Sequence, residues 1–149
     1  MKTRRLAVIA AVIAACALLA VAPSLVKSQS SPVVVINLTS GAEDLHSAWM
    51  GLNLARMSLE EKRDVVVFLN VRGPVFASRS KGARLAYRQH PRLSATLTGL
   101  AGRGARVLVC PLCAKELGIT EKDLIPGAAF ATKQSLFSKL GDNTVVFSY

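Results

Sequence analysis

Continuous apolar runs alternate along this chain with segments in which apolar residues recur every three or four positions. Three runs rich in β-branched residues, at positions 33–38, 64–70 and 107–109, are typical of strands buried on both faces of a sheet. A fourth run, at 144–147, predicts a last strand, and residues 125–130 predict a loop or a short strand. The sheet is therefore expected to have four or five strands.

Helical periodicity fills the gaps between these runs. Residues 45–57, 93–101 and 132–140 each carry apolar side chains at helical spacing, so each predicts a helix with one packed face. Strand and helix thus alternate throughout, which predicts a three-layer α/β/α domain with a mostly parallel sheet. In such sheets functional groups gather beyond the carboxyl ends of the strands. Three segments then face one crevice, namely residues 39–46, 70–74 and 110–113.

The first 30 residues differ from the α/β domain, which is expected at 31–149. A basic head precedes 17 consecutive apolar residues at 6–22, and a polar exit follows. This layout predicts an apolar helix that acts as a signal peptide or a signal anchor. The domain would then be exported, periplasmic or extracytoplasmic, and held in the membrane by residues 6–26 if the segment is not cleaved.

The N-terminal segment also carries features of two other kinds of export signal. Residues 13–16, which end at Cys16, resemble a bacterial lipobox, but the chain stays apolar beyond them. Arg4 and Arg5 resemble a twin-arginine signal, but the residues that follow match it poorly. Whether the segment is cleaved, anchored or lipidated stays open.

Charge narrows the range of partners. The chain carries a formal charge of +10, and four of its basic residues and none of its acids precede residue 31. The domain therefore has fifteen basic and nine acidic residues, a net charge of +6, which attracts small anions and acidic partners. Its basic residues are too dispersed, and its aromatics too few, to predict nucleic-acid binding. The stretch from Arg79 to Arg92 is expected to be a solvated basic face, with docking of an acidic partner as the alternative.

The candidate chemistry lies in the motif Cys110-Pro111-Leu112-Cys113. Cys110 directly follows an expected strand and precedes a short helix that ends at Gly118. The amide N–H groups of a first helical turn favour the thiolate form, the reactive form of cysteine. Cys113 lies three residues on, on the same helical face, where it could resolve a disulfide or a sulfur adduct on Cys110.

Two other interpretations of this cysteine pair are disfavoured. The pair supplies half of a zinc site, but no second CxxC or HxxxH exists, so no metal and no other cofactor is expected. A thioredoxin would need two antiparallel strands after its CxxC helix, and only one clear strand follows Cys113 here. His46, at the start of a helix beside the crevice, could orient or deprotonate a thiol, or simply face solvent.

The order of these elements resembles that of the DsrE/DsrF-like (TusD-like) sulfur-relay family. The resemblance covers residues 33–149 and is carried by residues 35–44 with His46, by 51–55, by 107–110 with Gly118, by 124–127 and by 145–147. It implies a small oligomeric α/β subunit in which Cys110 carries sulfane sulfur as a persulfide. The chain would act with sulfur donor and acceptor proteins or small sulfur compounds, as a sulfurtransferase-like carrier.

Two features depart from the relay members of this family. The export or anchor segment removes the chain from their cytoplasmic partners, and Cys113 could displace a persulfide on Cys110 by forming a disulfide. Two alternative functions therefore stay open. The protein could be a thiol–disulfide oxidoreductase that uses Cys110 and Cys113, or a non-catalytic oligomeric binding subunit.

Overall fold

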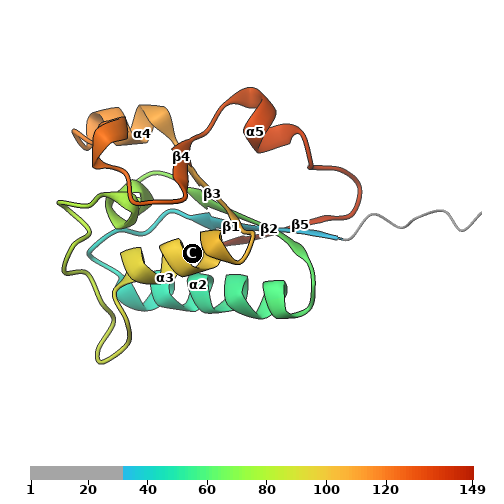
Figure 1. The fold of residues 1–149 in the computed structure, drawn as a ribbon, viewed down its shortest axis with the longest axis horizontal. Helices are drawn as coiled ribbons and strands as arrows, with labels where there is room; N and C mark the ends of the chain where they lie inside the picture. The colour runs from blue at the N-terminus through green and yellow to red at the C-terminus, as the bar shows by residue number, and fades with distance from the viewer. Residues whose placement is uncertain (1–31) are drawn as a thin grey trace, which may run out of the picture.

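A computed structural model of the chain describes residues 32–149, which form an α/β domain around one five-stranded sheet (Figure 1). The strand order is β4-β3-β2-β1-β5, and every pairing between neighbours is parallel. This confirms the predicted fold class. The strands are β1 (Val33–Leu38), β2 (Asp64–Leu69), β3 (Arg106–Val109), β4 (Ala128–Phe130) and β5 (Thr144–Ser148).

The expected apolar N-terminal helix, signal or anchor lies outside the described residues. Within residues 32–149, none of the helices has the length and apolar character that crossing a membrane requires.

Helices cover both faces of the sheet (Figure 1). One face carries α2 and α3, and α5 lies over the other, which gives the three predicted layers. The α5 helix ends at Phe137, earlier than its apolar spacing predicts, and the Leu140 N–H then bonds to the Phe137 carbonyl at 3.1 Å in a tighter turn. The helical elements are α2 (Leu45–Glu60), η1 (Gly73–Ala77), α3 (Leu93–Gly102), α4 (Pro111–Glu116), η2 (Glu121–Asp123) and α5 (Lys133–Phe137).

The start of α2 is fixed by a side-chain cap. The Asp44 carboxylate accepts the backbone N–H of Ser47 at 2.9 Å and the Ser47 hydroxyl at 2.6 Å, which satisfies one of the free amide groups of the first turn. Small residues then let the helix lie close to the sheet. A Cβ at Gly51 would lie 2.8 Å from a methyl carbon of Leu38. The cap and the close packing together hold the first turn of α2 at the carboxyl end of β1.

Two apolar clusters hold the layers together, one on each face of the sheet. The larger joins alternate residues of β1, β2 and β3 to α2, α3 and η1, and its bulkiest member is Phe76. The smaller contains Val33, Val35, Val66 and Leu108, with Leu136 of α5 packed against it. Burying each such aliphatic side chain contributes about 1.5–3 kcal/mol. The rigid sheet therefore positions the loops at its carboxyl edge.

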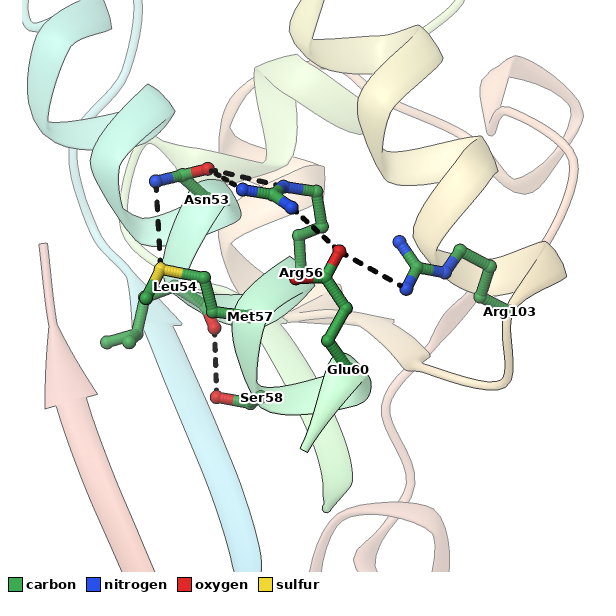
Figure 2. A network of polar contacts seen from close by, with 7 residues as sticks. All are labelled: Asn53, Leu54, Arg56, Met57, Ser58, Glu60 and Arg103. Atoms are coloured by element: carbon green, nitrogen blue, oxygen red, sulfur yellow. Dashed lines mark hydrogen bonds and ion pairs between the residues drawn. The ribbon is translucent and has the colours of Figure 1, made fainter. Parts of the chain in front are cut away.

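A polar network joins the carboxyl half of α2 to the end of α3 (Figure 2). The Arg56 guanidinium contacts the Glu60 carboxylate at 2.7 Å, and Arg103 approaches the same carboxylate at 3.6 Å. Asn53 accepts two further N–H bonds from Arg56. These half-exposed ion pairs lie at the end of α2 remote from Asp44, so they align the two helices away from the candidate chemistry.

The basic residues after η1, from Arg79 to Arg92, are exposed, as expected of a solvated face, and the start of this stretch is also anchored to the fold. Ser78 is fully buried, and its hydroxyl donates to the Asp123 carboxylate. The Ser80 hydroxyl donates to the same carboxylate, and the Arg79 side chain donates to the carbonyl of Leu124 at 2.8 Å. Asp123, one of the two acids of η2, therefore attaches the start of this stretch to the fold.

Candidate functional site

Three predicted segments meet beyond the carboxyl ends of β1, β2 and β3. The Asn70 N–H donates to the Leu38 carbonyl at 2.9 Å, and the Cys110 N–H donates to the Leu69 carbonyl at 2.9 Å. The Arg72 N–H also reaches the Thr39 carbonyl, at 3.2 Å. Each bond continues the parallel hydrogen-bonding pattern one step past the strands. The structure thus brings residues 39–46, 70–74 and 110–113 together at one edge.

Cys110 stands where β3 ends and α4 begins. It is a free, half-buried thiol and forms the N-cap of α4, with extended backbone dihedrals. The backbone N–H of Cys113 donates to its sulfur at 3.4 Å. The Cys110 sulfur is therefore partly reachable from solvent and supplied with a donor suited to an anion.

Cys113 has a different environment. It is also free and half-buried, but its thiol donates a hydrogen bond to Oδ1 of Asn70 at 3.2 Å. Burial raises the pKa of the Cys113 thiol, the neighbouring Cys110 side chain raises that pKa further, and the backbone N–H of Val71 opposes the rise. Cys113 is therefore held as a neutral thiol beside Cys110.

The turn that carries Asn70 is strained. Val71 has a φ of 51°, a left-handed conformation that a β-branched residue seldom adopts. Its N–H donates to Oδ1 of Asn70 at 2.9 Å, so one side-chain oxygen accepts from both Val71 and Cys113. Gly73 completes the turn directly against β1, where an added Cβ would lie 2.3 Å from the Leu38 carbonyl oxygen. The position of Asn70 is therefore closely determined.

His46, the third predicted site residue, packs in an aromatic cluster at the start of α2. Its ring stacks on Tyr87 with centroids 4.7 Å apart, and Trp49 stacks on His90 at 4.2 Å. Neither cysteine sulfur is among its hydrogen-bond partners in the part of the chain that the structure describes. His46 is exposed to solvent and stacks its ring on Tyr87, and its predicted role toward a thiol stays a prediction.

Asn70 is the residue of this site that sequence reasoning did not single out. It lies in one of the three predicted segments, and it directly follows a buried strand, which was the available signal. Its contact with Cys113, 43 positions away, depends on the pairing of β2 with β3. Among residues 32–149, no group of three or more metal-ligating side chains is found.

Comparisons with known proteins agree with this arrangement. A model described as the DsrE/DsrF-like family matches residues 33–147. The chain belongs to the DsrE/DsrF-like family. This confirms the resemblance seen in the sequence, and membership is consistent with sulfur relay in general.

One relative in sequence and two solved structures are similar to this DsrE/DsrF-like chain. Uncharacterized protein MJ0989 of Methanocaldococcus jannaschii is 33% identical over 117 residues, which cover 77% of this chain and 96% of that protein. The crystal structure of the ychN protein from E. coli matches with a TM-score of 0.64 at 19% identity, covering 80% of this chain and 99% of its own. MTH1491 from Methanobacterium thermoautotrophicum, a protein of unknown function, matches with a TM-score of 0.60 at 14% identity. The match covers 80% of this chain and 100% of MTH1491. These structural matches show the shared fold.

Proposed function

We propose that this protein is an exported or membrane-anchored sulfur carrier, which holds sulfane sulfur as a persulfide on Cys110. The observation that carries the proposal is the environment of the Cys110 sulfur. It is a free, half-buried thiol at the end of a central strand, and it receives an amide N–H at 3.4 Å. Family membership supports the same class of chemistry.

The transfer requires no external oxidant. The Cys110 thiolate attacks the outer sulfur of a donor persulfide, a new S–S bond forms, and the donor leaves as its thiolate. An acceptor thiolate then attacks the outer sulfur on Cys110 and restores the Cys110 thiolate. Donor and acceptor are thiol proteins or small sulfur compounds. Leu112 and Val71, which are 75% and 52% exposed beside the thiol-bearing segments, offer apolar contact to such a partner.

The alternative function, a thiol–disulfide oxidoreductase, uses the same two thiols. Both are free and lie within one turn of each other in α4 and its cap. The raised pKa of Cys113 makes it the poorer nucleophile near neutral pH, because thiolate is the attacking form. That asymmetry favours carriage of sulfur on Cys110 over rapid disulfide exchange.

We also propose that copies of this protein associate with one another, and the domain has a surface suited to this. The edge strand β5 leaves Val145, Val146 and Phe147 exposed, and a groove of about 440 Å³ runs from it to Leu54 and Met57 of α2. Glu61 and Arg63 line the same groove, and neither forms an ion pair within residues 32–149. A two-fold pairing would let each acid meet the partner's base. A non-catalytic subunit would use this surface alone.

The test of the carrier function is sulfur loading of the purified full-length chain. The protein is incubated with a sulfane sulfur donor, freed of donor, and weighed intact. We expect the mass of one added sulfur in the wild type and in Cys113→Ser, and none in Cys110→Ser. A second incubation with a thiol acceptor should remove that mass. Loading that survives Cys110→Ser unchanged contradicts the proposal.

Export or anchoring is tested separately by fractionation. We expect the chain in the membrane or extracytoplasmic fraction, and its intact mass there shows whether residues 1–30 are retained. Recovery of the uncleaved chain in the cytoplasmic fraction alone would contradict this part of the proposal and leave the sulfur chemistry untouched.

A further inference from the structure

We propose that Asn70 is a positioning residue that keeps Cys113 as a neutral thiol and thereby protects sulfur on Cys110 from displacement. This inference rests on the proposed function and adds to it the residue that separates sulfur carriage from disulfide formation. A second thiol so close to a persulfide can displace the bound sulfur by forming a disulfide.

The competing reaction is internal. If the Cys113 thiolate attacks Sγ of a Cys110 persulfide, a Cys110–Cys113 disulfide forms and the outer sulfur leaves as hydrosulfide. The two thiol sulfurs are oxidised together by two electrons, and the sulfane sulfur is reduced by two. No external reactant is needed, so only the reactivity of Cys113 limits the reaction. Its thiolate, and not its thiol, is the nucleophile.

Asn70 opposes that ionisation through one well-defined atom. Oδ1 of Asn70 accepts the Val71 N–H at 2.9 Å, and because that N–H can only donate, the oxygen and not the amide nitrogen must face it. The same oxygen lies 3.2 Å from the Cys113 sulfur. The sulfur can therefore contact it only as a donating S–H. Ionisation would lose this bond and place a negative sulfur against a carbonyl dipole.

Burial and the neighbouring Cys110 also raise the pKa of Cys113, so the Asn70 contact acts in the same direction as they do. Cys110 is the titratable neighbour that acts on Cys113, and it too disfavours a second negative charge. Arg72, two residues beyond Asn70, pairs with Glu43 at 3.5 Å, and Glu43 also accepts the Gly41 N–H. Lys115 and Glu116, the charged residues of α4, are exposed and of opposite sign. Within residues 32–149, the hydrogen bonds of the Cys113 side chain include none from a lysine or an arginine.

Two substitutions of Asn70 separate this role from a purely structural one. Asn70→Asp keeps an oxygen acceptor for Val71 and Cys113 but adds negative charge, so Cys113 should ionise at higher pH. Asn70→Ala removes the acceptor, so Cys113 should ionise at lower pH. A merely structural role would move both variants in the same direction or move neither.

The first measurement is the alkylation rate of Cys113 against pH, made on the full chain in a Cys110→Ser background. We expect the midpoint of alkylation about one pH unit higher in Asn70→Asp, and lower in Asn70→Ala, than in the Cys110→Ser protein that keeps Asn70. Equal midpoints, or shifts of the same sign, would overturn the inference. This measurement does not depend on sulfur loading, so it stands even if the carrier function fails.

The second measurement is hydrosulfide release from the sulfur-loaded chain without any acceptor. We expect release to be several-fold faster in Asn70→Ala than in the wild type, and to vanish in the Asn70→Ala/Cys113→Ser double variant. Release that persists in the double variant would overturn the protective role. Failure of the wild type to load at all would instead count against the proposed function.

Discussion

The backbone N–H of Cys113 donates to the Cys110 sulfur at 3.4 Å, while the Cys113 thiol itself donates away from Cys110, to Oδ1 of Asn70. One residue of the pair thus supplies a donor to its neighbour and is held protonated by a third. The two cysteines of the CPxC motif are therefore unequal, and the inequality is set by β2 as well as by α4.

The turn beneath this pair gives a direct test of its packing. In Gly73→Ala the new Cβ would lie 2.3 Å from the Leu38 carbonyl oxygen, which is backbone and cannot move aside. We expect this variant to lose about 1–3 kcal/mol of unfolding free energy. Urea unfolding of the full chain measures the change.

The matched control is Gly99→Ala, inside α3, where nothing lies within 4 Å of the added Cβ. An alanine there should stabilise the helix by about 0.5–1 kcal/mol. Equal changes in unfolding free energy for the two substitutions would show that the turn does not lie so close to β1.

Stability at low pH should depend on Asp123. Hydrogen bonds from the Ser78 and Ser80 side chains hold the pKa of Asp123 below 3.8, its usual value. A depressed pKa contributes stability above that value, which is lost as the pH falls through the folded pKa. We therefore expect the urea midpoint of the wild type to fall more between pH 7 and about pH 3 than that of Asp123→Asn.

Asp142→Asn serves as the control for this comparison, because Asp142 is exposed and accepts no side-chain hydrogen bond within residues 32–149. It should follow the wild-type pH profile. If Asp142→Asn flattens the profile as much as Asp123→Asn does, general charge and not the Ser78–Asp123 contact governs acid stability.

The stack between His46 and Tyr87 distinguishes two roles for His46. Phenylalanine keeps a flat ring but cannot exchange a proton. We expect His46→Phe to retain most of the rate of sulfur loading, and His46→Ala to lower stability by about 0.5–1.5 kcal/mol through loss of ring packing. A loading rate that falls many-fold in His46→Phe would instead support the role toward a thiol predicted from sequence.

Much of the fold follows from local patterns in the sequence. The β-branched runs at Val33–Leu38 and Asp64–Leu69 are typical of buried strands, and their alternation with helices predicts a parallel sheet. Cys110 could be placed at a strand end because Pro111, which favours the first turn of a helix, follows the apolar run at once. Asn70 could not be assigned a role, because its bond to Cys113 depends on strand register. The contacts of Asp123 with Ser78 and Ser80 depend likewise on how distant loops meet.

The exposed edge of the sheet predicts how copies associate. Phe147 of β5 is 39% exposed and lines the groove beside α2. A charge there should oppose burial of the groove between two copies. We expect Phe147→Asp to lower the mass of the protein in light-scattering chromatography, and Phe137→Asp, on exposed α5, to leave it unchanged. An unaltered mass in Phe147→Asp would assign self-association to another surface.

The most direct measurement of the central claim is the position of the bound sulfur. The wild-type chain is loaded with a sulfane donor, its thiols and persulfides are trapped by alkylation, and the peptides are weighed with fragmentation. We predict the extra sulfur on Cys110, with Cys113 recovered as an ordinary alkylated thiol. An extra sulfur found on Cys113, or on neither residue, would contradict the account.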